Sequence, residues 1–409
     1  MLKFSIKTLG CKLNQYESNV IMDRLIAGGH SFVKFGSVAD IVIINTCTVT
    51  DRSDKKWKIF VKQGAKSSLS GKVIVTGCAV NAYRERLLNQ PEILSVYSND
   101  EKELLITDIL KSGSSSLPPL PKNRTRAFLK IQDGCDGKCS YCIVPSVRGL
   151  PRSRNFFEII DEAKFLIDNN IPELVLTGIT IGKYCFDDYD LADLAAAIAA
   201  LPGNFRLRIT SIEPLHLSDK LIDVYSNDKV CSHIHLPLQS GSDRILSIMS
   251  RPYNSVQFLH VVDNIKNRFP EIAIGSDIIV GFPTESVIDF SDSCNVAKCS
   301  AFSYIHQFSY SARQGTVSAD MPDDPDKHEI KTRYELLKTL STELSLNFRN
   351  RFINKQLSCV IEHKKNTGVY GLSDNYIKII TDNLSPSDVG SLKKITLLKN
   401  NLESFGTAI

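Results

Sequence analysis

The chain has 409 residues, of which 43% are hydrophobic and 23% charged, with a formal net charge of +4. This composition is typical of a soluble globular protein of two or three domains. The slight basic excess is compatible with an RNA partner but does not establish one. No apolar run approaches the ~20 residues of a membrane span, and the N-terminus lacks a signal-peptide core. We therefore expect a cytoplasmic protein, without a membrane partner, whose thiols stay reduced.

Residues 1–110 alternate between strand-like and helix-like segments. The runs FSIKTLG, DIVIINT, KVIVTG and ILSVYSN carry β-branched residues and end at turn signals. Between the first two runs, NQYESNVIMDRLIAGG has an N-x-x-E capping pattern and a Gly–Gly stop. This alternation predicts an α/β region with a doubly wound parallel sheet.

Three cysteines follow the first three predicted strands. They are Cys11, Cys47 and Cys78. Because the carboxyl ends of parallel strands share one edge of a sheet, these thiols should converge. The spacing predicts a three-thiol metal or cluster site. The alternative is that small thiols merely suit the tight turns after strands, although this is less convincing for three equivalent positions than for one.

A basic segment follows Cys47. Residues 51–72 hold seven Lys or Arg against two Asp, and the only Trp of the chain lies among them. Basic side chains beside an aromatic ring suit a single-stranded nucleic acid. The candidate RNA contacts here are Lys55, Lys56, Trp57 and Lys58. A solvated helix face with one anchoring aromatic residue is an equally good interpretation.

Three further segments follow residues 1–110, and they differ in composition and in predicted secondary structure. Residues 111–126 are rich in Ser and Pro and predict a linker. Residues 127–350 contain six strand candidates with intervening helices, which predicts a partial (β/α)6 barrel with its site at the carboxyl ends of the strands. Residues 351–409 consist of short β-rich runs and predict a small all-β barrel.

A second set of cysteines lies near the mouth of the predicted central barrel. Cys135, Cys139 and Cys142 form a CxxxCxxC pattern directly after the strand FLKI. Three thiolates can hold three irons of a [4Fe–4S] cluster and leave the fourth iron open for a small ligand. A structural zinc would require a fourth ligand, and the next His is His216. Chance thiols, or a zinc site with an unseen ligand, remain the alternative.

Six motifs carry a family resemblance over essentially the whole chain. They are TLGCKLNQYES, NTCTVT, VTGCAV, GCDGKCSYCIVPSVRG, HLPLQSGSDRILSIMSR and SDIIVGFPTE. In this order they resemble the methylthiotransferase branch of the radical-SAM superfamily, whose members end in a TRAM domain. The resemblance implies that the first cysteine set holds an auxiliary [4Fe–4S] cluster. It implies that the second set holds the [4Fe–4S] cluster that cleaves S-adenosylmethionine (SAM), two molecules of which are used per turnover.

Three features favour one branch of this family, which acts on threonylcarbamoyladenosine beside the tRNA anticodon. GCKLNQYES resembles the N-terminal signature of that branch. RGLPRSR carries Leu150, Pro151 and Arg152, where the isopentenyladenosine branch tends to have acidic residues. FSYSARQGTVSADM resembles its PYSxRxGTxA segment, with Ser309 in place of Pro. Alternatives are isopentenyladenosine or a ribosomal-protein aspartate as substrate and, in another class, a non-catalytic zinc- and RNA-binding protein.

The resemblance also implies partners and further binding residues. We expect a tRNA substrate, an electron donor such as flavodoxin or ferredoxin, and a monomer. Candidates for SAM binding follow the barrel strands: Thr177, Gly178, Glu213, Gln239, Ser240 and Asp277. His233 and His235 alternate on one strand and either approach this site or belong to the core. Further RNA-binding candidates are Arg152 and, in the TRAM-like module, Asn375 and Tyr376.

Overall fold

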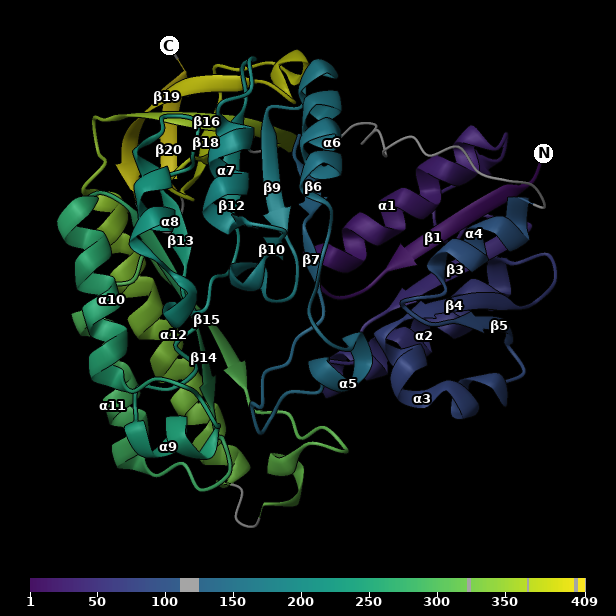
Figure 1. Cartoon of the computed structure of the whole chain (residues 1–409), viewed down its shortest axis with the longest axis horizontal. Coiled ribbons are helices and arrows are strands. Elements are labelled where there is room, and N and C mark those ends of the chain that lie inside the picture. The colour runs from purple at the N-terminus through teal and green to yellow at the C-terminus, as the bar shows by residue number, and fades with distance from the viewer. Residues whose placement is uncertain (111–124, 322–324, 366–367, 401–403, 409) are drawn as a thin grey trace.

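The protein is described here by a computed structural model that covers residues 1–110, 125–321, 325–365, 368–400 and 404–408. Three regions follow one another along the chain: an N-terminal sheet with helices, a central barrel and a C-terminal barrel (Figure 1). The predicted linker, residues 111–126, lies almost entirely outside the described residues. None of the helices in these ranges is both long enough and apolar enough to cross a membrane.

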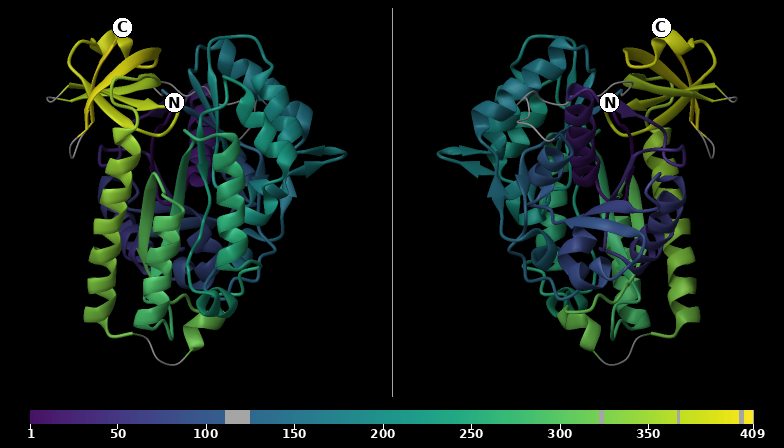
Figure 2. Two further views of the ribbon diagram at one scale, coloured as in Figure 1. Left: turned by 90° about the vertical axis from the view of Figure 1, so that its left-hand side faces the viewer. Right: turned by 90° about the vertical axis from the view of Figure 1, so that its right-hand side faces the viewer.

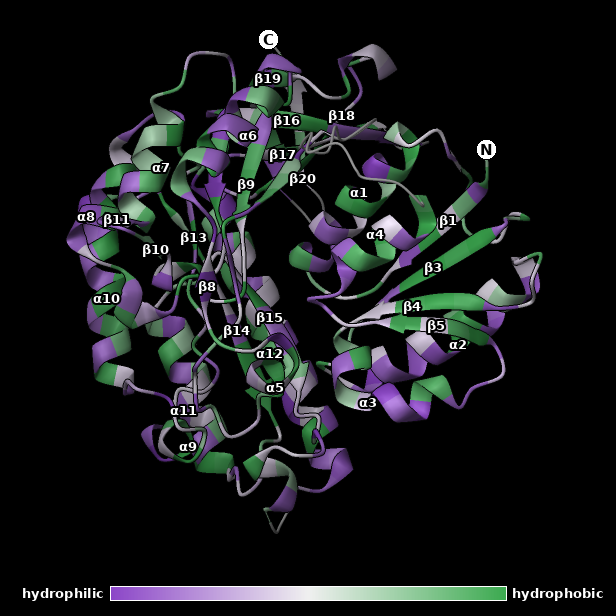
Figure 3. Ribbon diagram, turned by 45° about the vertical axis from the view of Figure 1, so that its right-hand side comes forward, coloured by the Kyte–Doolittle hydropathy of each residue, from purple (hydrophilic) through white to green (hydrophobic). Residues whose placement is uncertain are grey.

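The N-terminal region contains a five-stranded parallel sheet with the order β2-β1-β3-β4-β5. Its strands are β1 (Lys3–Thr8), β2 (Ser31–Phe32), β3 (Ile41–Thr46), β4 (Val73–Gly77) and β5 (Ile93–Tyr97). The inner strands β3 and β4 are largely apolar along their length (Figure 3), as expected for a sheet covered on both faces. The two-residue strand β2 was not predicted, because so short a segment has no periodic pattern.

Helices cover both faces of this sheet, which confirms the doubly wound prediction. On one face, α1 (Lys12–Ala27) and α4 (Lys102–Leu110) bury apolar side chains such as Leu25 and Leu105 against the strands. On the other face, α2 (Asp51–Ser67) and α3 (Cys78–Leu88) do the same. A 2-1-3-4-5 order places the reversal of the chain between β1 and β3, where ligands bind in folds of this kind.

The central region is an open barrel of six parallel strands. Two three-stranded sheets, β12-β9-β6 and β13-β14-β15, are joined where Leu207 bridges Val230 and Ser211 bridges His235. The strands are β6 (Ala127–Lys130), β9 (Glu173–Thr177), β12 (Arg206–Ile209), β13 (His233–His235), β14 (Ala273–Val280) and β15 (Tyr304–Ser309). All six correspond to predicted strands, so the partial (β/α)6 barrel is confirmed.

Helices surround the central barrel on its outside (Figures 1 and 2). They are α6 (Phe156–Asp168), α7 (Leu191–Ala199), α8 (Asp219–Asp223), α9 (Asp243–Ile248), α10 (Ser255–Arg268), α11 (Val287–Cys299) and α12 (Lys327–Asn350). The short helix α5 (Val144–Arg148) lies instead against α3 of the N-terminal region (Figure 1). Side chains at their N-termini accept hydrogen bonds from free backbone N–H groups, as Asn155, Asp190 and Asn254 do. The largest apolar core of the protein lies between these helices and the strands.

Short pairs of strands connect the larger elements. They are β7 (Gln132–Asp133) with β8 (Arg152–Ser153), and β10 (Cys185–Phe186) with β11 (Tyr189–Asp190). The pair β7–β8 encloses the loop that carries the second cysteine set and α5.

The C-terminal region is a closed five-stranded barrel, β16-β17-β18-β20-β19, as predicted. Its strands are β16 (Gln356–Lys365), β17 (Gly368–Ser373), β18 (Lys378–Thr381), β19 (Leu392–Asn400) and β20 (Ser404–Ala408). It is packed against the central barrel where strands such as β9 and β12 begin (Figure 1). Buried Arg206 and Arg208 donate to backbone carbonyls of β16 and β17 and pair with Glu173. This end of the central barrel is therefore covered by the C-terminal barrel, and the loop with the second cysteine set lies toward the other end.

Candidate functional site

The first cysteine set is gathered by three neighbouring strand ends. Cys11 lies at the N-terminus of α1 after β1, Cys47 follows β3, and Cys78 begins α3 after β4. Burial raises the pKa of Cys47 to about 11, and the thiols of Cys78 and Cys11 act on it in the same direction. Across the sheet, Asn45 of β3 lies opposite Thr8 of β1, and Thr46 of β3 lies opposite Gly77 of β4. The three thiols therefore occupy one place at the edge of the sheet, as the spacing predicted.

Glycine makes this convergence sterically possible. Gly10 has φ +96°, and a Cβ built on it would lie 2.9 Å from Cys47 Sγ. Gly77 has φ +99°, and its Cβ would lie 2.5 Å from Asn45 Oδ1. Both backbones adopt a conformation that side chains disfavour, and both leave no room for one. The glycines before Cys11 and Cys78 are thus part of the framework of the site.

Two asparagines connect the strand ends to one another. Asn14 Nδ2 donates to the carbonyls of Leu9 and Thr46, at 2.8 Å each. Asn45 Nδ2 donates to the carbonyl of Asn14 over 3.0 Å. Because both amides are fully buried, these bonds hold the loops that carry Cys11 and Cys47 in a fixed relation.

The second cysteine set is formed within one loop. Cys135, Cys139 and Cys142 lie between β7 and α5, and all three are partly exposed. Gly137 N donates to Cys135 Sγ over 3.2 Å, and Cys142 N donates to the carbonyl of Cys139 over 3.1 Å. Burial raises the pKa of Cys142 to about 11, with Cys139 and Cys135 adding to the effect. A Cβ built on Gly137 would lie 3.1 Å from Cys135 Sγ and 4.0 Å from Cys139 Sγ, so this loop holds these two sulfurs near each other.

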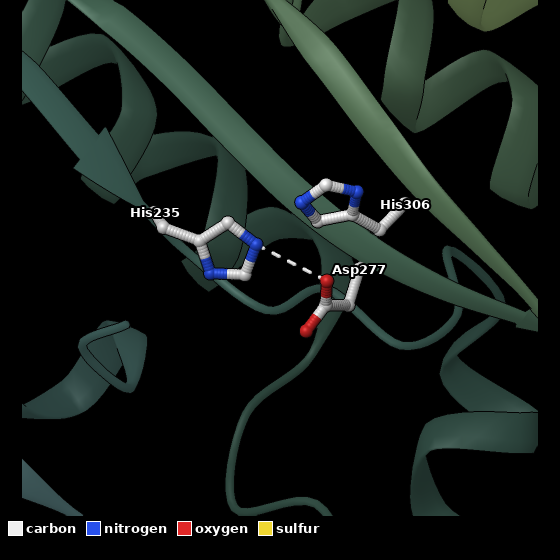
Figure 4. Close-up of side chains that lie close together, drawn as sticks. All are labelled: His235, Asp277 and His306. Carbon is white, nitrogen blue, oxygen red and sulfur yellow. Dashed lines mark hydrogen bonds and ion pairs between the residues drawn. The ribbon is translucent and has the colours of Figure 1, made fainter. Parts of the chain in front are cut away.

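One compact group of metal-ligating side chains lies outside the cysteine sets. In the described part of the chain, one group of three metal-ligating side chains has all its ligand atoms within 4.8 Å of one another: His235, Asp277 and His306 (Figure 4). Neither cysteine set does. Zinc, with Zn–S bonds of about 2.3 Å, draws its sulfurs to within about 4 Å of each other. A [4Fe–4S] cluster takes its ligands on separate irons and so holds them further apart, and the assignment of the two cysteine sets to clusters stays a prediction.

A buried ionic network joins the N-terminal region to the loop of the second set. Arg148, in α5, donates to Glu17 Oε1 over 2.7 Å and to Asp133 Oδ2 over 3.2 Å, and also bonds to Asn14. Lys102 pairs with Glu17 as well. Although burial disfavours a charged carboxylate, these cations hold the pKa of Glu17 well below its usual range. Glu17 therefore stays ionised and binds the two regions together.

A second buried link lies on the other side of the first set. Arg313, after β15, bonds to Asp54 and donates to Thr48 Oγ1 over 3.1 Å and to Tyr83 Oη over 2.8 Å. Its side chain is 5% exposed, so breaking this contact would leave charges buried without partners. Together the two links fix the sheet edge with the first set against the mouth of the barrel with the second.

Comparison with known proteins agrees with this arrangement. Residues 3–98 match the model of the uncharacterized protein family UPF0004, and residues 129–297 match the radical SAM superfamily. The threonylcarbamoyladenosine tRNA methylthiotransferase MtaB of Bacillus subtilis is 33% identical over 98% of this chain and 94% of its own length. The chain belongs to the radical SAM methylthiotransferase family.

Other relatives of similar identity carry a different name. The MtaB of Chlamydia pneumoniae is 35% identical over 92% of this chain and 90% of its own. The tRNA-2-methylthio-N(6)-dimethylallyladenosine synthase of Alkaliphilus oremlandii is 33% identical over 89% and 83%. Identity alone therefore does not separate the two substrates. Among solved structures, the radical SAM methyltransferase TsrM of Kitasatospora setae shares the fold, with a TM-score of 0.59 and 11% identity over 78% of this chain and 77% of its own.

Membership of the radical SAM methylthiotransferases implies a [4Fe–4S] cluster and SAM, and most SAM-binding candidates lie at or near the carboxyl ends of the barrel strands. Thr177 and Gly178 end β9, Gln239 bridges Ile278, and Asp277 is on β14. Ser240 is fully buried, bonded to Ser293 and to the backbone of Ser242. The hydroxyl of Ser240 thus shapes the turn, and its role in SAM binding, like those of the other candidates, stays a prediction.

Glu213 belongs to a feature that sequence reasoning missed. It forms an ion pair with Arg251, whose Nη1 also donates to Cys139 Sγ over 3.2 Å. Tyr253 Oη accepts from the same guanidinium and donates to the carbonyl of Pro237. Arg251 thus places a positive charge beside the second cysteine set, where it can stabilise an anionic cluster. Arg251 is the last residue of the motif HLPLQSGSDRILSIMSR, and this position could have identified it as a candidate site residue.

The RNA-binding candidates divide into exposed and buried residues. Lys55, Lys56 and Arg152 are exposed and Lys58 is half-buried. Trp57 is 1% exposed, and its Nε1 donates to Asp54 Oδ1 over 3.1 Å. It packs in the core beneath α2, so its prediction as a base-stacking residue is wrong.

The two candidates in the C-terminal barrel face the central barrel. Asn375 is 3% exposed and accepts from Ser373 Oγ. Tyr376 stacks on His233, with ring centroids 4.5 Å apart, and lies under the guanidinium of Arg208. The prediction that Asn375 contacts RNA is wrong because the amide is enclosed. Tyr376 instead belongs to the junction of the two barrels, and His233 is a core residue.

Proposed function

We propose that this chain is a tRNA methylthiotransferase that inserts a methylthio group at C2 of N6-threonylcarbamoyladenosine next to the anticodon. The observation that carries the proposal is the pair of three-thiol sets, one on the N-terminal sheet and one at the barrel mouth, fixed against each other by buried charges. The MtaB-named relatives over nearly the full chain support the choice of substrate.

In this proposal each cysteine set holds one [4Fe–4S] cluster. Cys11, Cys47 and Cys78 hold the auxiliary cluster, while Cys135, Cys139 and Cys142 hold the one that binds SAM. When bound, these groups supply the methylated sulfur and the 5′-deoxyadenosyl radical that removes hydrogen from the substrate carbon, with two SAM per turnover and electrons from a flavodoxin or ferredoxin.

The contribution of the chain itself is position and charge. Arg148 and Arg313 hold the two regions at one separation, so a base placed between them meets both sets of thiols. Arg251 adds positive charge beside Cys139, and Glu213 orients that guanidinium. The closed end of the barrel limits access of water to a reactive radical, which would otherwise be quenched.

Mass spectrometry of tRNA nucleosides from cells with and without the gene tests the proposal. We expect loss of 2-methylthio-N6-threonylcarbamoyladenosine and accumulation of its unthiolated precursor. A change confined to the isopentenyl nucleoside would show that the substrate is isopentenyladenosine, in agreement with the name of the Alkaliphilus relative. Unchanged nucleosides with a modified ribosomal-protein aspartate would move it to a protein, and no product of either kind would contradict the function.

A further inference from the structure

Three polar side chains meet inside the central barrel, outside both cysteine sets. His235 from β13, Asp277 from β14 and His306 from β15 point toward one another (Figure 4). His235 Nε2 lies 3.1 Å from Asp277 Oδ1, and its Nδ1 lies 2.7 Å from Ser211 Oγ. The His235 ring is thus oriented from both sides, and Asp277 and His306 are left to bond to a ligand in the barrel.

Positive charges from the other two regions surround this group. Lys378 of β18 lines one cavity together with His306, and Lys12 of α1 lies within electrostatic range of His306 and Asp277. Burial lowers the pKa of His306. The charge of Asp277 acts against this, while His235 and both lysines lower the pKa further. Among the described residues, the Lys12 ammonium, which is half-buried, makes no hydrogen bond or ion pair, although Asp277 lies within electrostatic range. An ammonium in this setting is stabilised by an anionic partner.

The charge arrangement decides which kind of ligand this place takes. Two histidines and an aspartate could by themselves hold a divalent cation. Two ammonium groups nearby repel such a cation and attract an anion. The geometry and charge together favour an organic anion that also carries hydrogen-bond donors.

There is space for such a group beside His306. A cavity of about 260 Å³ is lined by Tyr304 and His306 of the central barrel and by Tyr376 and Lys378 of the C-terminal region. Arg349 of α12 adds a further guanidinium to its wall. The cavity therefore has basic side chains (His306, Arg349 and Lys378) in an otherwise uncharged lining, and it lies where the regions of the protein meet.

We propose that Lys12, His306 and Lys378 bind the carboxylate of the threonylcarbamoyl group of the substrate, while Asp277, which His235 orients, accepts hydrogen bonds from its hydroxyl and urea N–H groups. This inference rests on the proposed function and names the part of the site that reads the substrate. An isopentenyl group is apolar and would leave these polar atoms unpaired, which costs far more than a poor fit between apolar surfaces. The same residues would then also reject the isopentenyl substrate.

The test compares three anticodon stem-loop RNAs that differ only in the N6 group: threonylcarbamoyl, its neutral carboxamide analogue and isopentenyl. Dissociation constants and kcat/KM are measured for the wild-type enzyme, Lys12→Gln and His306→Gln at equal iron content. Lys338→Gln, an exposed lysine of α12 paired with Glu335, is the matched control. Wild type should prefer the acid over the carboxamide by roughly 10- to 100-fold, the value of a hydrogen bond to a charged group. Each of the two site variants should reduce this preference to about threefold or less, and the control should keep it.

Two outcomes would overturn the inference while leaving the proposed function intact. One is equal binding of acid and carboxamide by the wild type, and the other is an unchanged preference in both variants. Thiomethylation of the isopentenyl RNA alone would instead remove the proposed function. Since Lys12 adjoins Cys11, a loss of iron in Lys12→Gln would leave His306→Gln to decide, because β15 holds none of the proposed cluster ligands.

Discussion

The two cysteine sets reach the same arrangement by different means. The second set lies within eight residues, on one loop between β7 and α5. The first set spans residues 11 to 78 and exists only because β1, β3 and β4 are neighbours in one sheet. A local loop needs few contacts to keep its shape. A site assembled from distant strand ends keeps its geometry only while all of these strands stay packed in the sheet. The first set should therefore be the more easily lost of the two.

The largest expected effect comes from removing one thiol of each set. Cys139→Ala should abolish both SAM cleavage and methylthio transfer, because the SAM-binding cluster loses a ligand. Cys47→Ala should abolish transfer but retain SAM cleavage. Iron should fall from about eight to about four atoms per chain in each variant. Iron content, 5′-deoxyadenosine and thiomethylated product are measured on the same preparation of each variant.

Cys185→Ala provides the control, since this exposed cysteine belongs to neither set. It should keep iron content and both activities. Full product formation by Cys47→Ala would show that the first set is not a cluster site, and the comparison between the two sets would then fail.

The next largest effect concerns the buried link between the sets. Arg148→Gln leaves Asp133 and Glu17 with fewer cations in a buried place, which should lower the free energy of unfolding by about 3 kcal/mol. Methylthio transfer should fall more than SAM cleavage, because only transfer requires both sets in register. Denaturant unfolding and the ratio of 5′-deoxyadenosine to product measure the two effects.

The matched control is Arg152→Gln, four residues further along the chain. Arg152 pairs with Asp100, but both side chains are more than half exposed, so its loss should cost less than about 1 kcal/mol. Equal destabilisation by the two variants would contradict the role given to the Arg148 network.

A smaller effect is expected from replacing Gly77, a glycine that precedes a cysteine of the first set only. Gly77→Ala introduces a Cβ 2.5 Å from the Thr46 carbonyl at a backbone φ of +99°, which should cost about 1–3 kcal/mol. The auxiliary iron should be lost preferentially, while SAM cleavage continues. Gly71→Ala is the control, because Gly71 also has positive φ but its Cβ would meet nothing within 4 Å. Loss of iron from both sets alike would argue against the different fragility of the two.

Much of the fold followed from local pattern. Apolar runs with turn signals located nearly every large strand, and strand–helix alternation gave the doubly wound sheet and the open barrel. The convergence of Cys11, Cys47 and Cys78 could be predicted because strand ends in a parallel sheet share an edge. Their role as cluster ligands stays a prediction, which the cysteine variants test.

Contacts between distant segments could not be predicted in the same way. Arg148 meets Glu17 across 131 positions of sequence, and Arg313 meets Asp54 across 259. Nothing local in either motif indicates its partner, because the partner is set by how the regions pack. The same cause explains why Asn375 proved to be enclosed.

The burial of Trp57 was, in contrast, available from the sequence. Trp57, Val61 and Ala65 are four residues apart, and all three are buried along one side of α2. This spacing forms an apolar stripe on a helix, but the basic residues around Trp57 drew attention to its surface neighbours instead.

The smallest effect follows from this correction. Trp57→Phe keeps an aromatic ring in the core and removes one hydrogen bond to Asp54. It should therefore lower the free energy of unfolding by about 1 kcal/mol and leave the affinity for tRNA unchanged.

Replacing Lys55 and Lys56, which are exposed on the same helix, should weaken tRNA binding and reduce its dependence on salt without affecting stability, if this face meets the phosphate backbone. Fluorescence anisotropy with labelled tRNA at two salt concentrations, beside denaturant unfolding, separates the two effects. A tenfold loss of tRNA affinity in Trp57→Phe at unchanged stability would mean that the indole leaves the core to meet RNA. The edge of the sheet that carries Cys47 would then rearrange on binding, and the first cysteine set would be assembled by the substrate and not only by the fold.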